Sequence, residues 1–210
     1  MVQHSFIWIG QKDDALLVYF CKEGQELGQT TAIYTNNIYE THRLSNLLGA
    51  LGIPATCLQL DISKSAREAA LDKIRRKECH AIITTDIAAT TQDPPISKVD
   101  RIINYNIGWK TTFQIYTQRT SNLRDASENS GRMITFMKPY ALALISRLER
   151  EDPNFILAEY EVNMDIVKAC DVQVQNAVSE NPSLRESDTR QVRAGFTQVL
   201  PLNQLAHLHI

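Results

Sequence analysis

Glycine is scarce in this chain of 210 residues, and so is any excess of positive charge. Only 8 residues are glycine, about half of the usual frequency of ~7%. Acidic residues number 24 and basic residues 22, so the formal net charge is −2. A chain without a strong basic field is not expected to bind nucleic acid tightly and without sequence preference.

Long hydrophobic runs and paired cysteines are missing as well. The longest apolar stretches, such as the one from Ala15 to Cys21, are far shorter than the ~18 residues that read as a membrane-spanning helix. The N-terminus, Met1 to His4, lacks the basic region and the small-residue cleavage site of a secretory signal. No CxxC pair occurs among the four cysteines, Cys21, Cys57, Cys79 and Cys170. We therefore expect reduced thiols in an intracellular protein that does not contact a membrane.

Several catalytic chemistries lack their sequence signatures here. The motifs GxxxxGK[ST], GxGxxG, HExxH and GxSxG are all absent from the sequence. His207 and His209 lie two residues apart at the chain terminus, and two ligands on a loose end make a poor metal site. We expect neither a bound metal nor a cofactor.

Short apolar segments alternate with amphipathic ones from Gln3 to Glu149. The first, residues 3–9, is rich in Phe, Ile and Trp and is typical of an edge strand. Asn36 or Asn37 can cap a helix over residues 38–51. Further strands are predicted at residues 31–34, 55–60, 81–84, 100–104 and 133–137, and further helices at 13–27, 61–76, 112–119 and 139–149. This order predicts an α/β fold, a doubly wound parallel sheet with helices on both faces.

The pattern changes beyond residue 150. Apolar residues recur at helical spacing and predict one long C-terminal helix within residues 151–179; they are Tyr160, Met164, Val167, Cys170, Val174 and Val178. Two interpretations stay open: the stripe covers the core of its own domain, or it docks a partner through Tyr160, Met164, Val167 and Val174. Glu180 to Arg193 is polar and predicts a mobile linker, and Phe196 to Ile210 is apolar again. We thus expect a domain at 1–150, a helix at 151–179 and a flexible tail at 180–210.

The order of motifs between residues 83 and 136 resembles one known domain. A strand ends in Thr84-Thr85-Asp86, and Asp93-Pro94-Pro95, Ile102-Ile103-Asn104-Tyr105, Gln118-Arg119 and Ser130-Gly131-Arg132 follow in that order. The series is similar to the second RecA-like domain, the helicase C-terminal domain, of DEAD-box RNA helicases. The resemblance covers about residues 3–149. The following helix resembles the extension of the branch that acts in pre-ribosomal RNA processing, which implies a nuclear or nucleolar location.

The resemblance implies RNA contacts for five residues. Thr35 and Asn36 fall at a strand-end motif that touches RNA, and Thr85 matches a threonine that holds a phosphate. Arg67 matches an arginine that contacts the RNA backbone, and Lys64 stands where the family has glutamine. Arg75, Arg76 and Lys77 follow on or just after the same predicted helix, where they are consistent with phosphate contacts or with a solvated helix face.

The side of the domain that meets ATP in the family is altered. Asp93 matches an aspartate that contacts the ribose, and Arg119 matches an arginine that is not a finger. Asn122 and Asp125 replace the two arginine fingers, each of which stabilises phosphoryl charge and is worth roughly 10³–10⁵ in rate. Leu60, Thr91 and Ser121 replace glycines that allow close backbone approach. We interpret Asp93, Arg119, Asn122 and Asp125 as a vestigial nucleotide side.

Three functions remain as hypotheses. The first is a non-catalytic, helicase-derived module, a pseudoenzyme that acts as a protein-interaction adaptor in an RNA-related complex with an unidentified protein partner. The second is weak RNA binding that is independent of ATP. The third is a helicase half that completes an ATPase with a first RecA-like domain in trans, since the chain begins almost at the second domain. The sequence does not predict an oligomeric state.

Overall fold

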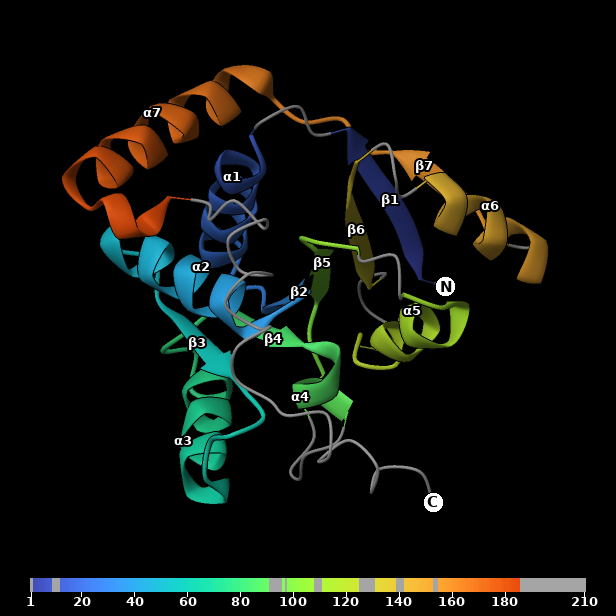
Figure 1. The fold of residues 1–210 in the computed structure, drawn as a ribbon, viewed down its shortest axis with the longest axis horizontal. Helices are drawn as coiled ribbons and strands as arrows, with labels where there is room; N and C mark the ends of the chain where they lie inside the picture. Colours follow the sequence, from blue (N-terminus) through green and yellow to red (C-terminus); the bar gives the residue numbers. More distant parts are fainter. Residues whose placement is uncertain are drawn as a thin grey trace, which may run out of the picture.

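A single parallel sheet organises the fold in the computed structural model, which describes residues 2–8, 12–90, 96, 98–107, 111–124, 131–138, 142–152 and 155–185 (Figure 1). Within these ranges seven strands follow the order β3-β4-β2-β5-β6-β1-β7, and every neighbouring pair is parallel. The strands are β1 Gln3–Trp8, β2 Thr31–Thr35, β3 Ala55–Leu58, β4 Ala81–Thr85, β5 Arg101–Asn104, β6 Arg132–Met137 and β7 Leu157–Glu159.

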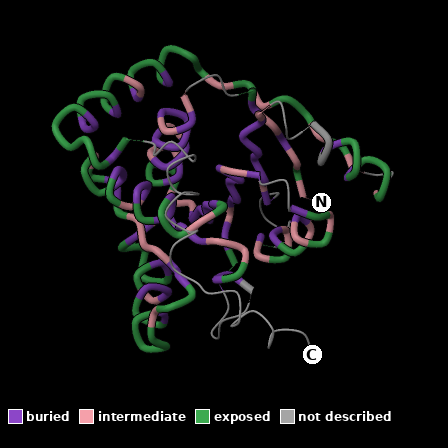
Figure 2. The backbone as a smooth tube through the Cα atoms, viewed as in Figure 1, coloured by how far each residue is buried: buried purple, intermediate pink, exposed green. Residues whose placement is uncertain are grey.

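Helices cover both faces of the sheet, which confirms the predicted α/β doubly wound class. One face packs against α1 (Asp13–Glu26), α2 (Ile38–Ala50) and α7 (Met164–Glu180). The other packs against α3 (Lys64–Arg75), α4 (Asp86–Thr90), α5 (Phe113–Thr120) and α6 (Leu142–Glu151). Figure 2 shows the buried residues gathered on the strands and on the inward sides of α1 and α2.

Polar side chains cap the first turns of α2, α3 and α5. The Asn37 side chain accepts a hydrogen bond from the Glu40 backbone N–H at 2.9 Å, and Ser63 and Thr112 cap α3 and α5 in the same way. Asn37 rather than Asn36 is therefore the cap of α2. Gly52 follows α2 with a φ of +70°, a left-handed conformation that side chains disfavour.

The strand predicted at residues 3–9 is present as β1, but the prediction that it lies at an edge of the sheet is wrong. β1 lies between β6 and β7, with His4 opposite both Met133 and Leu157. β7 continues into a hydrogen bond from the Tyr160 backbone N–H to the Phe6 carbonyl at 2.8 Å. A strand of three residues is too short to show an alternating pattern, so the sequence did not reveal it.

The C-terminal part differs from the prediction in two respects. Its helix, α7, begins only at Met164, because β7 and a connecting segment precede it. The first residues of the predicted linker are packed: Pro182–Leu184 form a short 3-10 helix, and Leu184 is only 1% exposed. Residues 186–210, including the apolar segment from Phe196, lie outside the described residues, and the boundary expected at residue 150 stays a prediction.

Candidate functional site

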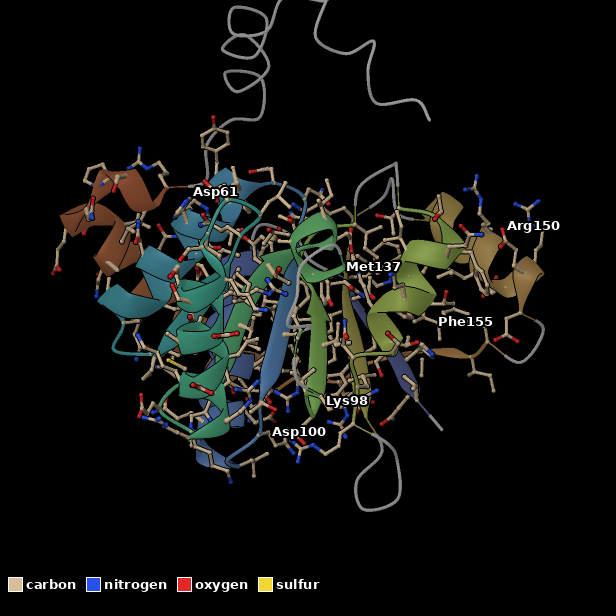
Figure 3. All side chains as sticks on the ribbon, turned by 90° about the horizontal axis from the view of Figure 1, so that it is seen from below. Asp61, Lys98, Asp100, Met137, Arg150 and Phe155 are labelled. Atoms are coloured by element: carbon tan, nitrogen blue, oxygen red, sulfur yellow. The ribbon has the colours of Figure 1, made fainter. Side chains whose placement is uncertain are left out.

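The carboxyl ends of the strands form one edge of the sheet, here called the carboxyl edge, and the opposite ends form the amino edge. Doubly wound sheets bind ligands outside the carboxyl edge. Thr35 ends β2 directly opposite Thr85, which ends β4, and Asn36 follows Thr35 in the chain. Figure 3 separates the two edges, with Asp61 toward the carboxyl edge and Lys98 and Asp100 at the amino edge. The fold therefore brings three of the five predicted RNA-contacting residues together.

Of these three residues at the carboxyl edge, only some are accessible to solvent. The Thr35 side chain is buried, and its hydroxyl lies 2.7 Å from the Thr41 hydroxyl and 3.2 Å from the Asn37 carbonyl oxygen. Thr85 is half-buried, and its hydroxyl oxygen accepts a bond from the Ala88 backbone N–H at 3.4 Å. Asn36 is exposed. The Thr35 hydroxyl thus stabilises the end of β2, and Asn36 is the group that a ligand can reach.

The basic residues of α3 form two groups rather than one. Lys64 is exposed in the first turn, at the carboxyl edge, whereas Arg75 and Lys77 lie at the end of the helix and just beyond it. The length of α3 separates Lys64 from Arg75, a rise of roughly 16 Å, and Lys77 lies beyond that end. Arg67 lies between the two groups and is only 1% exposed. Its guanidinium is closed to solvent in this structure.

Arg119 forms a buried ion pair where the family's nucleotide side is expected. Its Nε and Nη2 donate to the two carboxylate oxygens of Asp86, each at 2.7 Å, and its Nη1 donates to Asn104 Oδ1 at 2.6 Å. The guanidinium also lies 4.7 Å from the centre of the Tyr34 ring. Only 2% of the Arg119 side chain is exposed, against 30% for Asp86. A buried charge of this kind is tolerated because a bidentate partner and a further acceptor satisfy it.

Asn122, at the position of the first finger, turns inward. Its Nδ2 donates to the Tyr34 hydroxyl at 2.8 Å. Burial raises the pKa of Tyr34 to about 12, so the hydroxyl stays protonated and neutral. Tyr34, Asp86, Asn104, Arg119 and Asn122 are together called the Arg119 cluster below. Asp93 and Asp125, the other two residues of the predicted nucleotide side, lie outside the described residues.

Sequence reasoning missed a second buried arginine, Arg43. It donates to the Asp14 carboxylate at 2.7 and 2.9 Å, to Glu40 at 2.6 Å, to the Tyr105 hydroxyl at 2.9 Å and to the Leu184 carbonyl at 3.1 Å. Burial alone would lower the pKa of this guanidinium, but the hydrogen bond to Asp14 and the neighbouring charges raise it above its ordinary value. Among these partners only Glu40, three residues before Arg43 on a predicted helix, leaves a signal in the sequence.

The C-terminal stripe is mostly used inside the chain itself. Val167 and Val174 are buried in the core that contains α1. Tyr160 is half-buried, and its hydroxyl accepts a bond from Arg132 Nη1 at 2.9 Å. Met164 is 49% exposed. Of the four predicted docking residues, the structure therefore leaves Met164 as the one with a large exposed surface.

Neither metal binding nor membrane insertion finds support in the described ranges. They contain no group of three or more His, Cys, Asp and Glu side chains placed to hold a metal ion. Each helix described is too short or too polar to cross a lipid bilayer.

Comparisons with known proteins agree with this geometry. Residues 11–122 match the family described as helicase conserved C-terminal domain. An ATP-dependent rRNA helicase, rrp3, from Aspergillus fumigatus is 34% identical over 164 residues, which cover 78% of this chain and 33% of the relative. The chain thus spans about a third of the length of that relative.

Solved structures share the fold. The DEAD-box protein SrmB from E. coli, crystallised with the regulator of ribonuclease activity A, superposes with a TM-score of 0.67 at 19% identity, over 79% of this chain and 94% of that one. Domain 2 of the DEAD-box helicase Mss116p, bound to an RNA duplex, superposes with a TM-score of 0.65 at 18% identity, over 88% and 72% of the two chains.

Proposed function

This chain belongs to the helicase conserved C-terminal domain family, in the DEAD-box group, and from that membership we propose that it works without hydrolysing ATP, as an adaptor in an RNA-related complex. The observation that carries the proposal is the state of Asn122, which stands at the first finger position within the closed Arg119 cluster. Asn122 has no positive charge, and its Nδ2 donates to the Tyr34 hydroxyl. It therefore cannot stabilise a developing phosphoryl charge, which is what an arginine finger must do. Arg119, which is not at a finger position, is fully engaged by Asp86 and Asn104 and does not replace it.

An ATPase assay in trans tests this proposal. The chain is mixed with the first RecA-like domain of the Aspergillus fumigatus rRNA helicase and with RNA, and phosphate release is followed. We expect no hydrolysis above that of the added domain alone. The positive control is the matching C-terminal domain of the same helicase, which shows that the two halves can assemble. Hydrolysis by the unmodified chain at a rate near that of the control would overturn the proposal and support a helicase half that works in trans.

A restored variant sharpens the assay. Asn122→Arg combined with Asp125→Arg returns both finger positions to arginine. Partial recovery of hydrolysis would locate the defect in these two positions. The companion variant, Asn122→Gln with Asp125→Asn, alters the same sites without adding positive charge, and we expect it to stay inactive.

The adaptor role is supported by what proteins of the same fold bind. SrmB was crystallised with a protein partner, and the rRNA helicase relative points to ribosome biogenesis, with a nucleolar location as our proposal. Because Val167 and Val174 are buried in the core that contains α1, we do not place the partner on the buried part of the stripe. We place it at the carboxyl edge or at the exposed side of α7, where Met164, Ile166 and Val172 lie.

RNA binding without ATP is the second candidate. Asn36 and Lys64 are exposed at the carboxyl edge, and the Mss116p domain of the same fold was solved on an RNA duplex. Fluorescence anisotropy with a labelled RNA at low and at physiological salt, with and without ATP, tests it. Salt-sensitive binding in the micromolar range that ignores ATP would favour this candidate. No binding at low salt would leave protein docking as the function of the module.

A further inference from the structure

A concave cavity of about 580 Å³ opens at the amino edge of the sheet, away from the Arg119 cluster. Its walls come from the turn between α1 and β2, the end of α3, the residues that lead into β5, the chain after α5 and the first residue of β6. The volume lies within the ~300–1,000 Å³ range of small-molecule sites. Lys98 and Asp100, labelled in Figure 3, mark its position below the strands.

The lining is strongly cationic although the whole chain is mildly acidic. Six lining residues are basic, against two acidic ones, Glu23 and Asp100. The basic residues are Arg75, Lys77, Lys98, Arg101, Arg124 and Arg132. The described residues of the lining therefore carry an excess of four positive charges, in a protein whose formal net charge is −2. A cleft lined by one sign of charge focuses its field and attracts the opposite ion.

The two acidic groups neutralise only two of these cations. Glu23 pairs with Arg101 at 2.6 Å. Asp100 pairs with Arg124 at 3.1 Å, and its second oxygen accepts from the Thr30 N–H and hydroxyl. Both carboxylates are thus satisfied within the wall of the cavity and add little repulsion toward an anion.

Three of the basic groups in the lining form no ion pair with another described residue. Within the described part of the chain, Lys77, Lys98 and Arg132 have no acidic partner; Lys98 donates to the Ser121 carbonyl, and Arg132 donates to the Tyr160 hydroxyl. Arg75 pairs with Asp72, which lies outside the lining. Lys77, Lys98 and Arg132 can therefore bind an anion without first losing one of these ion pairs, whereas Arg75 would have to release Asp72.

Helix termini do not explain the whole set. α1, α3 and α5 end at this edge, and cations are stabilised near helix C-termini. That effect accounts for Arg75 and Lys77, at the end of α3 and just beyond it. It does not account for Lys98, Arg101 and Arg132, which precede or begin strands. Charges supplied by separate elements converge on one cavity.

We propose that this amino-edge cavity binds a compact small-molecule polyanion that carries several phosphate groups. The described lining residues include arginine and lysine donors, which suit phosphate oxygens, and none of them is aromatic. Single-stranded RNA is normally held by aromatic stacking platforms along a groove. A lining without such a platform favours a ligand recognised through its phosphates alone. The proposal does not depend on the proposed function.

Isothermal titration calorimetry of the 210-residue chain with inorganic tripolyphosphate tests the proposal. The pocket variant is Lys77→Asn with Lys98→Gln. Lys77 has a φ of +59°, and asparagine tolerates this left-handed conformation, so the backbone is preserved. The control variant is Lys22→Gln with Lys168→Gln, which removes the same charge from α1 and α7, outside the cavity. Circular dichroism checks that all variants are folded.

We expect tripolyphosphate to bind at least tenfold more tightly than sulfate and to weaken as salt is raised. The pocket variant should lose at least tenfold in affinity, about 1.4 kcal/mol, while the control variant stays within about twofold of the native chain. Binding no tighter than that of sulfate, or equal losses in both variants, overturns the proposal. A second result would also overturn the proposal: a 12-nucleotide RNA binds through Lys77 and Lys98, and tripolyphosphate does not bind. That result would assign the cavity to nucleic acid.

Discussion

The carboxyl edge and the amino edge of the same sheet differ in how exposed their arginines are. At the carboxyl edge Arg43 and Arg119 are buried, and carboxylates hold both through bidentate contacts. At the amino edge Arg101 is buried and ion-paired as well, but Arg75 and Arg124 are exposed and line an open cavity. Arg43 and Arg119, at the edge that the family would use for ligands, are satisfied internally, whereas the edge without an assigned role also presents guanidinium groups to solvent.

The difference shows that a residue type in a motif does not establish that the residue is available. A guanidinium buried with a bidentate carboxylate has already exchanged its water for protein groups, so releasing it toward a ligand would uncover an unpaired charge on its partner. An exposed guanidinium is still hydrated, and leaving its partner costs little free energy. The first kind contributes to the stability of the fold, and the second kind gives up only a weak surface ion pair when it binds a ligand.

The strongest way to break this comparison is to remove one arginine from each edge. Arg119→Met leaves the buried side of Asp86 and Asn104 without their donor, and we expect a loss of about 3–5 kcal/mol in the free energy of unfolding. Arg124→Met, at a side chain that is 60% exposed, should cost about 1 kcal/mol or less. Urea unfolding followed by circular dichroism measures both. Equal losses would show that burial does not separate the two edges.

A second test asks whether the α7 stripe is core or docking surface. Val167→Ala removes two methyl groups from a closed core, and we expect a loss of about 2 kcal/mol from lost burial and the cavity left behind. Met164→Ala, at the exposed start of the same helix, should change stability by less than ~0.5 kcal/mol. The same urea experiment applies. A negligible effect of Val167→Ala would return this residue to the docking candidates.

A third test concerns the accessible charge at the carboxyl edge. If RNA contacts Lys64, Lys64→Gln should remove one phosphate contact and lower the affinity for a single-stranded RNA roughly fivefold at 100 mM salt, because each contact adds about 0.7 to the salt slope. Anisotropy at several salt concentrations measures both quantities. Lys98→Gln, an equal change at the amino edge, should leave RNA binding unaltered. An unchanged salt slope for Lys64→Gln would remove this residue from the RNA interface.

The smallest expected effect is the pH response of the β1 strand near the amino edge. Burial lowers the pKa of His4, although Asp152 opposes the shift. The unfolded chain therefore binds this proton more readily, so His4 reduces the free energy of unfolding as pH falls below about 6.5. Above that pH both states are neutral and the contribution is constant.

Urea unfolding at pH 7.5 and pH 5.5 reveals this effect as a difference between two proteins. The native chain should lose more stability across this interval than His4→Gln, which has no imidazole to titrate. Identical losses in the two proteins would show that His4 titrates alike in the folded and unfolded states.

Local periodicity predicted most of the fold, and it failed where elements are short. The six longer strands and the helices on both faces carry repeating apolar positions that a sequence displays directly. β7 has three residues and α4 has five, which is too few for a period to appear. α7 was predicted to begin too early because Tyr160 shares the apolar spacing of the helix that follows it.

The location of the candidate site could be predicted, but its accessibility could not. Thr35 and Thr85 end neighbouring parallel strands, so they lie at the same edge of the sheet regardless of the contacts that their side chains make. Whether Arg119 is free depends on Asp86, 33 residues away in the sequence, and on the packing of Tyr34. Contacts of this range leave no periodic signal, and the same holds for Arg43.

The contact between Arg43 and the Leu184 carbonyl has a consequence for how the domain is made. The two groups are 141 residues apart, and a ribosome that adds ~5–20 residues per second takes about 7–28 s to cover that distance. Throughout this interval the nascent chain presents the apolar side of α1 without α7 to cover it. The last described residues are therefore needed to complete the domain. The apolar side of α1, which is synthesised early, is the surface that needs protection from aggregation for the longest time.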